Sequence, residues 1–113
     1  MIRVVLAFAL LAAGLAHARD IEVKQKDQAF SIEAIDAHVG DRLVFRNEGA
    51  SFHNAFSVSA AHWFNLGVYP VNATRTLSLL HEGTLEIECA MHPGEKLVVT
   101  VAAQKARVAR SDP

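Results

Sequence analysis

The sequence has little of several features that would assign it to other classes of protein. Its 113 residues include one cysteine and three prolines, and the formal net charge is −1. A single cysteine excludes an internal disulfide. The absence of a concentrated basic stretch argues against nucleic acid as a partner. Apolar residues keep helical spacing nowhere after Asp20, and internal repeats are absent, so a helical or repeat architecture is not expected.

A long apolar run is also missing. The apolar stretch from Val4 to Ala16 covers 13 residues, whereas a membrane-spanning helix needs about 20. Arg3 precedes this stretch, and Ala16-His17-Ala18 follows it as a small-residue cleavage site. The pattern predicts a secretory signal peptide over residues 1–18 rather than a membrane anchor. No cysteine lies directly after the cleavage site for lipid attachment, so we expect a soluble exported protein, periplasmic if the cell has an outer membrane.

The remainder is long enough for one domain. Removing residues 1–18 takes away only Arg3 of the 11 basic residues and none of the 12 acidic ones, which leaves 95 residues with a formal charge of −2. A chain of this length supports one modest core. We expect the domain to cover residues 19–103. Residues 104–113 have little to bury and are expected to form a flexible tail.

Alternation of apolar and polar residues predicts an all-β domain. We expect a two-sheet Greek-key β-sandwich of seven to eight strands, because each sheet must bury its apolar face against another. The middle segment, 59–72, shows the least regular pattern. It is predicted to be a connection packed on the flank of the domain, with Trp63, Phe64 and Tyr69 as packing residues. The expected strands cover residues 21–24, 30–33, 42–47, 53–58, 73–80, 84–89 and 97–101.

The clearest strand leads into the single cysteine. Leu85, Ile87 and Cys89 share one face of this strand, so the thiol is predicted to point into the core. An exported chain with one cysteine can use it for intermolecular pairing, as an inert buried thiol or as a metal ligand. The cysteine count alone favours the buried thiol.

The neighbouring residues add a metal hypothesis. His92 follows Cys89 by three residues on a short Pro-Gly loop, and His53 begins a strand that can reach the same end of a sandwich. Two imidazoles and a thiolate, with a weak fourth ligand, are the donor set of blue-copper sites. By spacing alone, copper ligation and an unrelated buried thiol remain equally open.

A resemblance extends over roughly residues 27–103. The segments that carry it are similar to small cupredoxins such as plastocyanin, amicyanin and pseudoazurin, and also to cupredoxin-like proteins associated with methylamine utilisation. They are residues 39–47 (VGDRLVFRN), the pair His53-Asn54, residues 56–69 (FSVSAAHWFNLGVY), residues 83–94 (GTLEIECAMHPG) and residues 96–101 (KLVVTV).

The resemblance implies one bound copper ion. It assigns His53, Cys89 and His92 as ligands, and it places Asn54 behind them, where its side chain ties the His53 strand to the Cys89 loop. The edge of the His92 imidazole, close to an apolar surface, is the usual route for electrons in this family.

One position departs from the family pattern. An axial methionine commonly follows in the form C-x-x-H-P-x-M, and this slot is occupied by Glu95. As a ligand, the carboxylate is expected to favour Cu(II), lower the reduction potential and give a green or red centre. The alternatives are that Glu95 points to water and leaves three ligands, or that a backbone oxygen of Phe52 binds instead. Met91 is expected at the surface rather than on the metal.

Other candidate groups have simpler interpretations. His62 and His81 are expected to be solvated or capping residues. The acidic side chains of Glu82, Glu86 and Glu88 are interpreted as an ordinary solvated strand face.

The predicted function is that of a monomeric, periplasmic single-electron carrier with one copper ion and redox proteins as partners. It is not expected to be an enzyme, because it has one saturated mononuclear site. The alternative is a protein for copper resistance, storage or delivery, whose partners are copper acceptor proteins.

Overall fold

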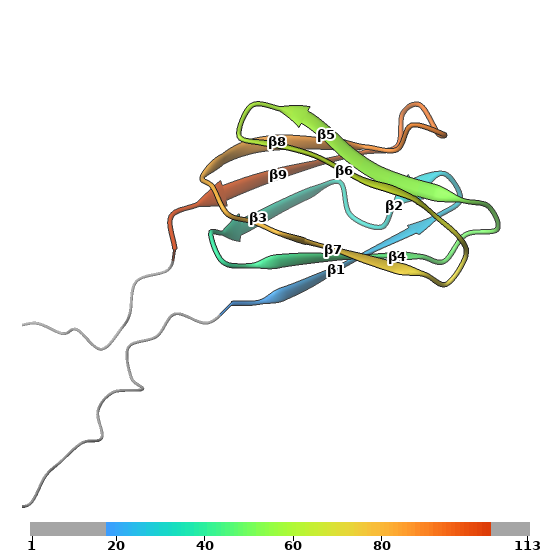
Figure 1. Ribbon diagram of the computed structural model, residues 1–113, viewed down its shortest axis with the longest axis horizontal. Coiled ribbons are helices and arrows are strands. Elements are labelled where there is room, and N and C mark those ends of the chain that lie inside the picture. The colour runs from blue at the N-terminus through green and yellow to red at the C-terminus, as the bar shows by residue number, and fades with distance from the viewer. Residues whose placement is uncertain (1–17, 105–113) are drawn as a thin grey trace, which may run out of the picture.

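The computed structural model describes residues 18–104, which form nine strands in two sheets (Figure 1). The predicted signal peptide, apart from Ala18, and the predicted tail from residue 105 onward lie outside the described residues. The strands are β1 (Asp20–Lys26), β2 (Ala29–Phe30), β3 (Ala34–His38), β4 (Arg42–Asn47), β5 (His53–Ser59), β6 (His62–Tyr69), β7 (Thr74–Ser78), β8 (Gly83–Glu88) and β9 (Lys96–Ala102). Within the described residues, no helix is long and apolar enough to cross a membrane.

The two sheets pack face to face as a sandwich, which confirms the predicted fold class (Figure 1). One sheet has the strand order β2-β1-β4-β7, and the other has the order β3-β9-β8-β5-β6. Strands β1 and β4 pair in parallel, as do β3 and β9, and the other neighbours are antiparallel. Non-sequential neighbours in both sheets are what a Greek-key connectivity produces.

Alternation on the central strands builds the core. Leu85 and Ile87 of β8 and Leu97 of β9 are fully buried, and they face Leu43 and Phe45 of β4 across the sandwich. Each fully buried aliphatic or aromatic side chain contributes roughly 1.5–3 kcal/mol of transfer free energy.

The middle segment was predicted incorrectly as an irregular connection. Residues 62–69 form β6, an edge strand that pairs with β5 from Ser59↔His62 to His53↔Tyr69, with an irregularity between Asn54 and Phe56. The irregular apolar pattern arises because Trp63 is 73% exposed, while Tyr69 is fully buried. Tyr69 therefore packs as expected, and Trp63 does not.

The expected strand at 30–33 is also wrong in its extent. Only Ala29–Phe30 pairs with β1, and a separate strand, β3 at Ala34–His38, pairs in parallel with β9. β3 and β6 are the two strands without an expected counterpart, and they bring the number of strands to nine, above the predicted range of seven to eight.

Candidate metal centre

The loop after β8 folds back on itself and carries three of the predicted ligands. Cys89 continues the buried face of β8 and is 2% exposed, as the alternation predicted. The His92 N–H then donates to the Cys89 carbonyl at 3.2 Å, and the Glu95 N–H donates to the His92 carbonyl at 2.9 Å. Gly94 has a φ of 100°, which glycine adopts without strain. Two successive tight turns thus turn residues 89, 92 and 95 toward one point.

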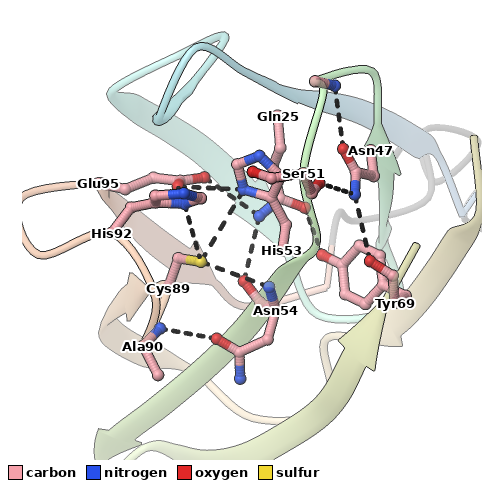
Figure 2. A network of polar contacts seen from close by, with 11 residues as sticks. Gln25, Asn47, Ser51, His53, Asn54, Tyr69, Cys89, Ala90, His92 and Glu95 are labelled. Atoms are coloured by element: carbon pink, nitrogen blue, oxygen red, sulfur yellow. Dashed lines mark hydrogen bonds and ion pairs between the residues drawn. The ribbon is translucent and has the colours of Figure 1, made fainter. Parts of the chain in front are cut away.

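The fourth residue comes from the neighbouring strand. His53 begins β5, and its Nδ1 lies 3.2 Å from Glu95 Oε1 and 3.9 Å from Cys89 Sγ. His92 Nδ1 lies 3.1 Å from the same carboxylate oxygen and 3.6 Å from the sulfur. The donor atoms of all four side chains lie within 4.8 Å of one another (Figure 2). The structure therefore brings together the four residues named from the sequence.

The cluster is closed on most sides. His53, Cys89 and Glu95 are each 1–2% exposed, whereas the His92 side chain is 13% exposed. Glu95 does not point to water. Among the four, the His92 ring offers the most direct path between the cluster and the surface.

Asn54 forms hydrogen bonds that fix the position of the Cys89 sulfur. Its backbone N–H donates to Cys89 Sγ at 3.4 Å, and its side-chain Oδ1 accepts from the Ala90 N–H at 2.7 Å (Figure 2). Its Nδ2 donates in turn to Asn65 Oδ1 at 3.4 Å. These bonds connect β5 to the Cys89 loop and set where the sulfur lies relative to His53.

Burial sets the protonation of the metal-free cluster. It raises the pKa of the Cys89 thiol, although the N–H groups of Asn54, Met91 and His92 oppose this shift. Burial also lowers the pKa of His53, against the attraction of Glu95 and together with the charge of His92. Both shifts favour the neutral forms of these side chains in the metal-free protein, so a cation that binds here has to displace the thiol proton.

The donor set fits a copper ion. A thiolate and two imidazoles are soft and intermediate ligands that suit copper, and Glu95 supplies a carboxylate oxygen on the same point. Placing such a charged oxygen in a dry pocket costs several kcal/mol unless it is paired, and a metal ion at this point would pair it.

Two polar residues beside the cluster, Gln25 and Tyr69, are fully buried. The sequence analysis missed Gln25 and assigned Tyr69 to packing only. The Gln25 Nε2 donates to Glu95 Oε2 at 3.1 Å, and its Oε1 accepts from the Tyr69 hydroxyl. A signal for Gln25 existed in the sequence. It follows Val23 by two residues, so the alternation that buries Val23 also turns this amide into the core.

The remaining candidates lie elsewhere. Met91 is 37% exposed and lies at the surface. His62, at the opposite end of the β5–β6 pair, is buried, and its Nε2 accepts from the N–H groups of Leu80 and His81. It is therefore a capping group, one of the two roles expected for it.

Comparison with solved structures defines the fold as cupredoxin-like. The Cu(I) form of an amicyanin variant with a methionine-to-alanine substitution matches with a TM-score of 0.67 and 21% identity, over 72% of this chain and 80% of that chain. A purple cupredoxin from Nitrosopumilus maritimus matches with a TM-score of 0.66 and 18% identity, over 73% of this chain and 99% of that chain.

A reduced amicyanin variant with a tryptophan-to-tyrosine substitution matches equally well, with a TM-score of 0.66 and 21% identity. No family model and no curated protein matches the sequence. The chain thus has a cupredoxin-like fold with a buried His₂CysGlu cluster at one end.

Proposed function

We propose that this protein binds one copper ion through His53, Cys89, His92 and Glu95 and carries single electrons between protein partners. The observation that supports this function best is the convergence of the four donor atoms within 4.8 Å in a buried cluster. A copper ion bound there would supply one-electron chemistry by alternating between Cu(II) and Cu(I).

The surrounding residues suit this role because they restrict the movement of the four ligand side chains. The three donors of the 89–95 loop are held by the two turns at His92 and Glu95, and the sulfur receives the Asn54 N–H. Ligands that are held in this way change position little between oxidation states, which keeps electron transfer fast. The partly exposed His92 ring is the proposed route for the electron.

The N-terminal pattern supports a periplasmic location, with redox proteins as the partners of a monomer. No substrate is transformed in this proposal, because four side chains occupy the positions around the metal and none is left open for one.

A specific observation favours a second function, copper resistance, storage or delivery. Glu95 is buried, and one of its carboxylate oxygens lies 3.1–3.2 Å from both imidazoles. A hard anionic donor in this position stabilises Cu(II) more than Cu(I). A protein that retains Cu(II) is suited to holding the ion and passing it to an acceptor protein.

The visible and electron paramagnetic resonance spectra of the copper-loaded protein, residues 19–113, test the site. We expect an intense thiolate-to-copper absorption band that Cys89→Ser abolishes. If Cys89→Ser leaves the spectrum of the loaded protein intact, the copper assignment is wrong.

Glu95→Met tests the fourth ligand. We expect a higher reduction potential and a changed visible spectrum, because a thioether replaces the carboxylate. If neither changes, Glu95 is not a ligand. Fast electron self-exchange in the wild-type protein supports the carrier, whereas copper transfer to a metal-free acceptor supports the second function.

A further inference from the structure

A hydrogen-bonded bridge crosses the core behind Glu95. Gln25 lies on β1 in the four-stranded sheet, whereas Asn54 and Glu95 belong to the end of the opposite sheet. The Gln25 Nε2 donates to Glu95 Oε2 and to the Asn54 carbonyl, each at 3.1 Å (Figure 2). This single side chain thus contacts two parts of the cluster. Its amide bonds to the backbone of Asn54, which follows the predicted ligand His53, and to the carboxylate of the predicted ligand Glu95.

The partners of the Gln25 amide determine which way it faces. Both N–H bonds of its Nε2 are used by acceptors, and its Oε1 accepts from the Tyr69 hydroxyl. A flipped amide would set its carbonyl oxygen against the Glu95 carboxylate and the Asn54 carbonyl, two groups that cannot donate. Burial raises the pKa of Tyr69, so its hydroxyl remains protonated and able to donate. The Tyr69 hydroxyl therefore stabilises the one orientation in which Gln25 donates to Glu95.

The bridge makes the two carboxylate oxygens of Glu95 different. Oε1 lies 3.2 Å from His53 Nδ1 and 3.1 Å from His92 Nδ1, whereas Oε2 is turned to Gln25. The three side chains that form the bridge, those of Gln25, Tyr69 and Glu95, are fully or almost fully buried. Water has little access to take the place of the amide, so the contact is not readily replaced.

We propose that Gln25, oriented by Tyr69, is a positioning residue that presents only Oε1 of Glu95 to the copper ion and weakens the carboxylate as a donor. This inference rests on the proposed copper site. Without the amide, Oε2 would lose its hydrogen-bond donor, be a stronger electron-pair donor and be free to turn toward the cluster. Both changes favour Cu(II) over Cu(I). Removing the carboxylate itself, as in Glu95→Met, is expected to have the opposite effect.

The test compares the reduction potentials and visible spectra of four copper-loaded proteins. These are the wild type, Gln25→Met, which removes the amide at similar length, Tyr69→Phe, which removes only the hydroxyl, and Ser57→Ala. Ser57 is a matched control, because it is a buried polar residue whose hydroxyl accepts only from the Ser59 N–H among the described hydrogen bonds. Each substitution is then repeated in a Glu95→Met background.

We expect Gln25→Met to lower the reduction potential, which corresponds to a ratio of Cu(II) to Cu(I) affinity that is raised by about tenfold or more. This is the scale of one hydrogen bond to a charged group. Tyr69→Phe should move this ratio in the same direction by less, and Ser57→Ala should not move it. In the Glu95→Met background the effects of Gln25→Met and Tyr69→Phe should disappear. In the metal-free protein, the Gln25 side-chain protons should exchange with water faster in Tyr69→Phe than in the wild type.

An unchanged or reduced ratio in Gln25→Met overturns the inference, as does a shift of the same size with and without Glu95. If Gln25→Met does not fold, Tyr69→Phe decides by the same criteria. A wild-type protein without a thiolate-to-copper band overturns the copper site and the inference together. A normal band with no effect of Gln25 or Tyr69 overturns the inference alone.

Discussion

The two ends of the β5–β6 pair each hold two histidines in contact, and only one of these pairs forms a candidate metal centre. The rings of His53 and His92 lie 4.6 Å apart, and those of His62 and His81 lie 5.3 Å apart, with the same 50° tilt. Ring proximity therefore does not distinguish them. The difference lies in what the ring nitrogens contact.

At the His53 end, backbone N–H groups are satisfied by other acceptors. The Ala90 N–H donates to the Asn54 side chain, so the Nδ1 atoms of both histidines remain directed at the thiol and the carboxylate. At the His62 end, two backbone N–H groups donate to His62 Nε2 itself, at 3.0 and 3.2 Å. Among the described residues, no cysteine or carboxylate converges with His62 and His81. At the His62 end, the backbone thus occupies the lone pair of His62 Nε2, which leaves that nitrogen unavailable to a metal.

Replacing one histidine of each pair with alanine should separate the two ends most clearly. We expect His53→Ala to lower copper affinity by at least about a hundredfold, beyond the range seen when residues behind the ligands are changed. His62→Ala should leave the affinity unchanged, because its nitrogen does not face the metal. Competition titrations with a copper chelator measure both values, and an equal loss in the two variants would contradict the distinction.

Asn54 is expected to have the next largest effect. Asn54→Ala removes the acceptor for the Ala90 N–H and should lower copper affinity by about 10- to 100-fold. The same titration applies, with Ser57→Ala as the control for a buried polar deletion in the same strand. An unchanged affinity in Asn54→Ala would mean that the loop keeps its conformation without this bond.

Folding stability, unlike copper affinity, should depend on His62. His62→Ala leaves two backbone N–H groups without their acceptor, so we expect the free energy of unfolding to fall by about 1–3 kcal/mol. His81→Ala, which removes the ring that packs on His62, should cost less. Urea unfolding of the metal-free proteins measures the difference, and a larger loss in His81→Ala would contradict the capping role.

A smaller effect is expected from pH. Burial, together with the charge of His81, lowers the pKa of His62 below its usual value. The unfolded chain then binds this proton more readily than the folded protein, so the stability contribution is present above about pH 6.5 and is lost as the pH falls through the lowered folded pKa. Urea unfolding of the copper-loaded protein between pH 7.5 and 5 should show a shallower slope in His62→Ala than in the wild type. An identical slope would show that this group does not contribute.

Where alternation is strict, the sequence predicted the strands closely. β8 and β9 alternate without interruption and were placed within a residue or two. β6 was missed because an edge strand tolerates exposed apolar side chains, such as Trp63 and Val68, which remove the alternation. β3 was missed because it has only two inward residues, Ile35 and Ala37, and an alanine adds little to an apolar pattern.

The residues of the candidate site also differ in how well the sequence predicted them. Cys89, His92 and Glu95 lie within seven residues and could be named from local spacing and family resemblance, and His53 from its neighbour Asn54. The Gln25 contact depends on how the two sheets face each other, and no local pattern contains that information. A polar residue at an inward position of a strand was the available sign.

The short loop from Cys89 to Glu95 has a consequence for the unfolded chain. Three of the four donors lie within seven consecutive residues, so this part of the donor set stays close together even in an unfolded chain. An unfolded chain would then retain part of its affinity for copper, and the metal would stabilise the folded state by less than its full binding free energy. Copper bound to these donors before folding would hold the β8–β9 connection closed, and His53, 36 residues from Cys89 along the chain, would be the one donor that still has to arrive from a distant strand.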